Sequence, residues 1–155
     1  MSQISNDVEF KQALEGLSPI KQRTLAAAFV AHVLPLSHDE RLNRVVSIAA
    51  VEHAMEDELL NALRSARAAT FDSHARCGSE GHWNEQAGYF VARAAVAAVT
   101  PPAQSRAGGA AWQAAMSSRM ARTSMLIDDG EGEPTAPAEN EWQYQTLSDY
   151  LNANG

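Results

Sequence analysis

Alanine dominates the apolar residues of this chain and constrains its fold more than any other feature does. The 155 residues include 29 alanines but only nine valines and four isoleucines. Alanine favours the α-helix more than any other residue, whereas the β-branched residues that favour strands are scarce. We therefore expect an all-α protein. Alanine also leaves little side chain between two packed helices, so we expect helices that approach one another closely.

Start and stop signals mark five or six helices within residues 1–127. We expect these helices to form one domain, a compact bundle. In each helix, apolar residues recur at helical spacing between residues that favour helix ends. We expect helices over about 7–16, 19–34, 37–49, 55–76, 80–99 and 110–127. The apolar stripe of the fourth helix is predicted to contain Leu59, Leu60, Leu63, Ala66 and Phe71.

Several helix ends have specific capping signals. Ser18 is a good N-cap, and Pro19 follows it at the first helical position, where the missing N–H costs nothing. Ser37 and Glu40 fit the S-x-x-E capping box, which predicts that the third helix begins at Ser37. Gly78 is expected to be the C-cap of the fourth helix.

The charge of the chain is concentrated in its last 28 residues. The net charge is −7, yet residues 1–127 sum to zero, and residues 128–155 hold seven acids and no base. Residues 128–140 are acidic and rich in Pro and Gly, which predicts a disordered linker. A neutral body with an acidic tail lacks the basic face that nucleic-acid binding needs, so we expect no nucleic-acid partner.

Residues 141–155 are rich in aromatic residues and predict a short amphipathic helix that recognises a partner. The expected partner-binding residues are Trp142, Tyr144, Leu147, Tyr150 and Leu151. Their partner would be a protein with a basic or apolar groove. The alternatives are a helix that packs on its own domain and a disordered end. Some arginines of the later helices are candidates to receive the acidic tail, in cis or from a neighbouring molecule: Arg64, Arg67, Arg76, Arg93, Arg119 and Arg122.

The stretch DSHARCGSEGHWNEQ contains the second candidate site. His74 and Cys77 are three residues apart, as are His82 and Glu85, so each pair would share a helix face and could bind a metal. Cys77 could alternatively be a thiol nucleophile. The spacing matches no strong metal or catalytic signature. We therefore interpret the stretch as a joint between two helices and expect no cofactor.

Other features indicate where the protein is found. No apolar run approaches the roughly 20 residues that span a bilayer, and the N-terminus does not resemble a signal peptide. One cysteine excludes an internal disulfide framework. We expect a cytoplasmic protein without a membrane partner. Its composition leaves self-association open.

The segment HVLPLSHDERLNRVVSIAA, residues 32–50, and the Ala-rich helices up to residue 99 resemble a family of bacterial immunity proteins, which are small and helical. The resemblance implies a non-enzymatic protein that acts by binding another protein. The favoured function is a protein-binding factor of the immunity, adaptor or assembly type. The alternatives are a metal-binding or thiol-dependent enzyme or sensor centred on the His74 stretch, and an acidic mimic that occupies a nucleic-acid-binding surface.

Overall fold

The computed structural model describes residues 3–80, 83–128 and 137–154; for residues 76–80, 83–85, 126–128, 137 and 154 it describes the backbone alone. Within these ranges all of the regular secondary structure is helical, as the alanine content predicts. The α-helices are α1 Asp7–Glu15, α2 Pro19–Val33, α3 Arg41–Ala49, α4 Glu56–Glu80, α5 Trp83–Val99, α6 Gly109–Asp128 and α7 Pro137–Asn154. Two short 3₁₀-helices, η1 Leu34–Leu36 and η2 Pro102–Gln104, lie between them.

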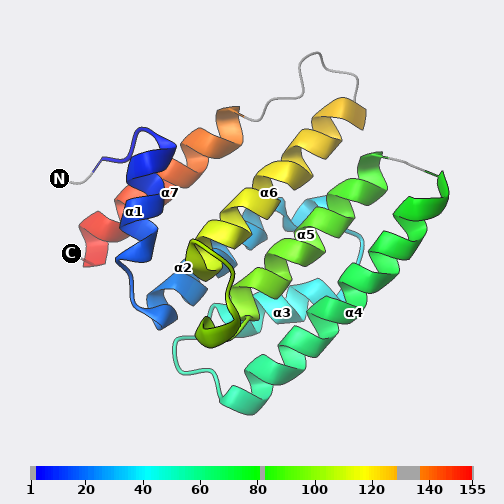
Figure 1. The fold of residues 1–155 in the computed structure, drawn as a ribbon, viewed down its shortest axis with the longest axis horizontal. Helices are drawn as coiled ribbons and strands as arrows, with labels where there is room; N and C mark the ends of the chain where they lie inside the picture. Colours follow the sequence, from blue (N-terminus) through cyan, green and yellow to red (C-terminus); the bar gives the residue numbers. More distant parts are fainter. Residues whose placement is uncertain (1–2, 81–82, 129–136, 155) are drawn as a thin grey trace.

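Three long helices, α4, α5 and α6, lie side by side as one layer, as Figure 1 shows. Helices α2 and α3 pack behind this layer, with α2 against α5 and α6 and α3 against α4 and α5. Helices α1 and α7 lie together at the α6 side of the molecule, next to the ends of the chain. This arrangement leaves α4 at the opposite edge of the layer from α7.

The interface between α5 and α6 is built largely of alanine and is the most extensive helix contact in the described structure. Its buried residues include Ala92, Ala95, Ala98, Ala111, Ala114, Ala115 and Ala121. Ser118 is also fully buried there, and its hydroxyl donates a hydrogen bond to the carbonyl of Ala114 at 2.8 Å. The larger core residues, such as Phe10, Phe29 and Leu42, lie where α1, α2 and α3 meet this layer.

The start of α2 agrees with its capping signal, and the start of α3 does not. Ser18 caps α2 through its hydroxyl, which accepts a hydrogen bond from the amide of Lys21. The predicted capping box at Ser37 is wrong, because α3 begins only at Arg41. Ser37 is extended after η1, and its hydroxyl accepts from the amide of Asp39 at 3.1 Å. The carboxylate of Asp39 accepts from the amide of Arg41 at 3.0 Å, and the N-cap position of α3 is Glu40, whose side chain makes no capping hydrogen bond.

The prediction that Gly78 caps the fourth helix is also wrong. Helix α4 continues through Gly78 and ends at Glu80. A single glycine inside a helix costs only about 1 kcal/mol, which the rest of a 25-residue helix can offset. The joint therefore lies between Glu80 and Trp83, two residues beyond the predicted cap.

Candidate functional site

The five residues predicted to bind a partner lie on α7, which packs in cis against α1, α2 and α6. Leu147 is fully buried in the hydrophobic core, and Trp142, Tyr144, Tyr150 and Leu151 are partly buried against it. Helix α7 begins at Pro137, inside the range predicted as linker, with proline at the first position and Glu139 in the first turn. Residues 129–136 of that predicted linker lie outside the described residues.

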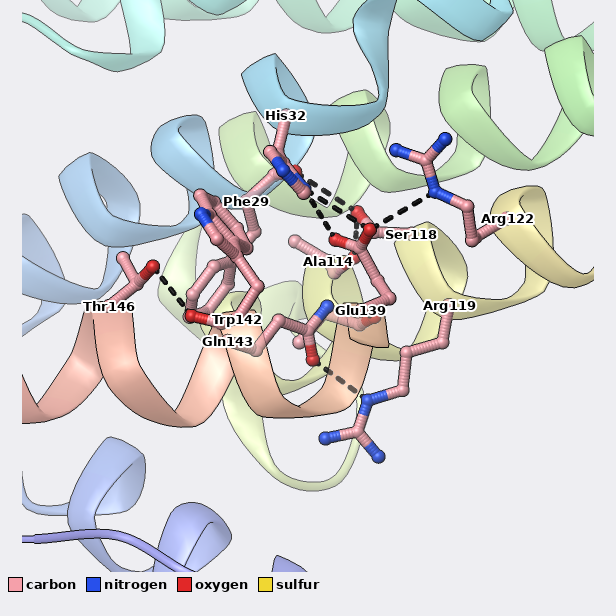
Figure 2. A network of polar contacts seen from close by, with 11 residues as sticks. Phe29, His32, Ala114, Ser118, Arg119, Arg122, Glu139, Trp142, Gln143 and Thr146 are labelled. Atoms are coloured by element: carbon pink, nitrogen blue, oxygen red, sulfur yellow. Dashed lines mark hydrogen bonds and ion pairs between the residues drawn. The ribbon is translucent and has the colours of Figure 1, made fainter. Parts of the chain in front are cut away.

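A buried carboxylate fastens the start of α7 to the body of the protein. The side chain of Glu139 is 1% exposed and lies between His32 of α2 and Arg122 of α6. Its oxygens are 2.8 Å from Nδ1 of His32 and 3.2 Å from Nε of Arg122, as Figure 2 shows. An ionised carboxylate can be buried only where charged or polar partners replace water, and these two residues supply them.

A second polar contact lies one helical turn further along α7. The buried amide of Gln143 donates to the carbonyl of Ala115 at 3.0 Å and accepts from Nε of Arg119 at 2.8 Å (Figure 2). Arg119 also donates to the carboxylate of Asp7 at 3.2 Å, and Tyr144 donates to the same carboxylate at 2.6 Å. Arg119 thus joins α1, α6 and α7.

These contacts shift two pKa values in opposite directions. The hydrogen bond from Arg119 lowers the pKa of Asp7 and is the largest effect on it. Burial opposes this change, and the hydrogen bond from Tyr144 lowers the pKa further. Burial raises the pKa of Tyr144, and its bond to Asp7 adds to the rise. Both shifts favour an ionised Asp7 beside a neutral Tyr144, the pair of states in which tyrosine donates its proton to the carboxylate.

Docking of α7 in cis accounts for two of the six arginines proposed to receive the acidic tail, namely Arg119 and Arg122. In this position the apolar side of α7 is covered by the body of the protein. Capture of a partner by Trp142, Tyr144, Leu147, Tyr150 and Leu151 would therefore require α7 to leave this position, and their partner-binding role stays a prediction.

The His74 stretch is described only in part. His74 is exposed, and its ring lies 5.6 Å from the ring of Tyr89 on α5. The side chains of Cys77, His82 and Glu85 lie outside the described residues, so the proposed metal or thiol site stays a prediction. Among the side chains that the structure describes, no three His, Cys, Asp or Glu residues gather as metal ligands.

A basic hollow lies on the outer face of the layer, between α4, α5 and the start of α6. Its volume is about 610 Å³. Four basic side chains line it: Arg67 and His74 from α4, Arg93 from α5 and Arg106 from the loop before α6. None of the described residues that line it carries a carboxylate.

Aromatic and apolar side chains complete the basic hollow. Phe71 is 74% exposed at its edge, which contradicts its predicted place in the apolar stripe that packs α4 on the core. The stripe residues Leu63 and Ala66 are buried as expected. The guanidinium of Arg93 lies 5.8 Å from the ring centre of Tyr89, a cation–π contact that keeps this arginine over the floor of the hollow.

A second hollow, which we call the apolar hollow, continues from the first toward the start of α4. It has a volume of about 490 Å³ and includes the partly exposed side chains of Ile20 and Leu60. The two hollows share Thr100, Ser105 and Ala110. We refer to the two hollows together as the α4–α6 groove.

The α4–α6 groove is not evident from the sequence alone. Leu60, Arg64, Arg67, Phe71 and His74 recur at helical spacing on α4, and all five are exposed in the structure. The signal was a stripe that combines large apolar residues with arginines. From the sequence alone, the apolar residues of this stripe are assigned to the core and its arginines to solvent. The groove becomes visible only in the structure, because α5 and α6 supply its other wall and its floor.

No protein family, curated protein or solved structure matches this chain. The resemblance of residues 32–99 to immunity proteins therefore stays a prediction. None of the helices in the described ranges combines the length and the apolar character needed to cross a membrane.

Proposed function

We propose that this protein is a non-enzymatic protein-binding factor that engages its partner through the α4–α6 groove. The observation that carries the proposal is the exposure of Phe71 and Leu60 beside Arg67 and Arg106 along one continuous depression. Protein interfaces are enriched in aromatic residues and arginine and are poor in lysine and acids at their centre. The described lining of the basic hollow has this composition.

The proposed class of function is the one predicted from the sequence, but the proposed contact surface is the α4–α6 groove and no longer α7. Helix α7, predicted to be the recognition segment, supports the body from the opposite edge of the layer. The lining of the α4–α6 groove, in contrast, includes the exposed side chains of Leu60, Arg67 and Phe71. Immunity, adaptor and assembly proteins all belong to the proposed class, and the groove does not select among them.

Photo-crosslinking in the native cell tests the proposal in the full-length protein. A photoreactive phenylalanine analogue would replace Phe71 in the groove, Gln145 on the exposed side of α7, or Asn43 on the exposed side of α3. We expect one discrete protein adduct from position 71 and none from position 43. An adduct from position 145 without one from position 71 would support the tail as the recognition segment. Equal labelling from all three positions would contradict both surfaces.

A further inference from the structure

We infer that the α4–α6 groove receives an acidic amphipathic helix of the partner protein. This inference rests on the proposed function and specifies the chemistry of the partner. The charge required of the partner is the reverse of that expected for a partner of the acidic tail.

Four arginines outside the basic hollow have hydrogen-bond or ion-pair partners within the chain, namely Arg23, Arg41, Arg119 and Arg122. Arg23 donates to the carbonyls of residues 49, 51 and 52 after α3, at 2.6 to 3.2 Å. Arg41 pairs with Asp39 at 2.6 Å and with Asp72 at 2.9 Å. Arg119 and Arg122 contact α1 and α7. No described carboxylate lines the basic hollow, so an incoming carboxylate would meet Arg67, Arg93 and Arg106 without competition from an acid of the lining.

Several polar groups of the basic hollow already donate hydrogen bonds within the chain. Thr70 donates its hydroxyl proton to the carbonyl of Ala66 at 2.8 Å, and Thr100 donates to the carbonyl of Val96 at 2.6 Å. The side-chain amide of Gln113 donates to the carbonyl of Ala107 at 2.7 Å. The guanidinium groups of Arg67, Arg93 and Arg106 are the cationic donors of the lining, and guanidinium binds carboxylate in a bidentate geometry.

The length of the groove suits a helix. Leu60 and Phe71 mark the apolar and basic hollows and are eleven residues apart on α4. Eleven residues of helix span about 16 Å, so a partner helix that lies along α4 could place apolar residues about three turns apart into the two hollows. A small organic anion would fill the basic hollow but would leave the apolar hollow empty.

The walls of the groove favour a helix over an extended peptide. Helices α2, α4, α5 and α6 form most of the walls, the segment around η2 completes them, and the described residues include no strand. An extended peptide would find no sheet edge here to pair with its own backbone. A helix satisfies its backbone internally and needs only side-chain contacts. Carboxylates on its flanks would then face Arg67, Arg93 and Arg106 across the apolar contact.

Synthetic peptides of about 16 residues test the inference by fluorescence anisotropy with the full-length protein. The first has Leu and Trp at i, i+4, i+7 and i+11 and Glu at the flanking positions. The second has Lys in place of every Glu. The third has the composition of the first, with two central residues replaced by Pro to prevent a helix. Phenyl phosphate serves as a small aromatic anion.

We expect the acidic helix to bind at least tenfold more tightly than the lysine or proline peptide, with an affinity that falls as salt rises. Arg67→Glu and Arg106→Glu change exposed side chains and should each weaken binding about tenfold, whereas Arg44→Glu on the exposed side of α3 should not. Phe71→Ala should weaken binding at all salt concentrations.

Several outcomes would overturn the inference. Equal binding of the proline peptide would show that the groove takes an extended chain, and equal binding of the lysine peptide would exclude charge as the selector. Tight binding of phenyl phosphate with no peptide binding would make the hollow a small-molecule site. If position 71 crosslinks a protein but no acidic peptide binds, the proposed function stands and the acidic helix is the wrong occupant. If position 71 crosslinks no protein and no acidic peptide binds, both the proposed function and the inference of an acidic helix are wrong.

Discussion

Trp142 of α7 lies flat against His32 of α2, with ring centroids 3.6 Å apart and ring planes at 6°. Nδ1 of the same histidine is 2.8 Å from the carboxylate of Glu139, one turn earlier on α7. His32 therefore contacts α7 with both its ring face and its ring nitrogen. Contacts this specific place α7 at one register on the body, whereas an apolar surface alone would leave the register less defined.

Leu147 is the main apolar anchor of α7, so shortening it should destabilise the whole protein. It is fully buried, and Leu147→Ala should lower the free energy of unfolding by about 2–5 kcal/mol, as expected for a leucine in a packed core. The matched control is Leu60→Ala, because Leu60 is 39% exposed and should cost less than about 1 kcal/mol. Urea unfolding of both variants measures the difference. Equal losses would show that α7 is not packed as described.

The buried carboxylate of Glu139 should contribute far more to the stability of the protein than the carboxylate of Glu141. Glu139→Gln removes the anionic partner of His32 and Arg122, which are partly exposed, and leaves a buried neutral amide in its place, so we expect a loss of about 1–3 kcal/mol in unfolding free energy. Glu141 is exposed on the same helix, and Glu141→Gln should change stability by less than about 0.5 kcal/mol. Thermal unfolding at neutral pH compares the two. A silent Glu139→Gln variant would argue that α7 does not dock through this cluster.

How far the sequence predicted these features depended on whether the deciding contact was local. The start of α2 depends on Ser18 and Pro19 alone, and the prediction was confirmed. The start of α3 depended on which of several nearby oxygens accepts the amide protons, and the carboxylate of Asp39 accepts the amide proton of Arg41. Spacing alone does not distinguish these acceptors, because the 3₁₀ turn of η1 changes the chain direction first.

The surfaces were harder to predict than the helices, because they depend on which helices become neighbours. The apolar face of residues 141–155 was evident, but its cover came from Phe10, Phe29 and His32, more than 100 residues away in the chain. Phe71 satisfied the helical spacing of a core residue, and only the position of α5 shows that it lies outside the core. Prediction of the α4–α6 groove required both the pattern of residues on α4 and the knowledge of which helices lie beside it.

The pKa of Asp7 predicts that part of the stability is lost in acid. The pKa is lowered from its ordinary value of 3.8, chiefly by the hydrogen bond from Arg119, so the folded state binds fewer protons than the unfolded state near that pH. The contribution is therefore fully present above pH 3.8 and is lost as the pH falls through 3.8 toward the lower folded value. Because the side chain is half exposed, the effect should stay below about 1 kcal/mol.

Urea unfolding of the wild type and of Asp7→Asn at about pH 6 and about pH 2.5 measures this contribution. The wild type should be the more stable protein at the higher pH, and the gap should close at the lower pH. Asn at this position can still accept from Tyr144 but carries no charge for Arg119. A gap that stays constant across the two pH values would mean that Asp7 does not titrate with folding.

Gly108, in the loop that carries Arg106 to the start of α6, should not tolerate a side chain. Its φ of +92° lies where L-residues are strained, and an added Cβ would lie 2.3 Å from Cδ1 of Trp112. Gly108→Ala should therefore lower the unfolding free energy by about 1–3 kcal/mol. Gly88 within α5 provides the opposite case, because an added Cβ meets nothing within 4 Å, and Gly88→Ala should raise stability by about 0.5–1 kcal/mol. Chemical denaturation of the two variants should give changes of opposite sign; a neutral Gly108→Ala would refute the described loop.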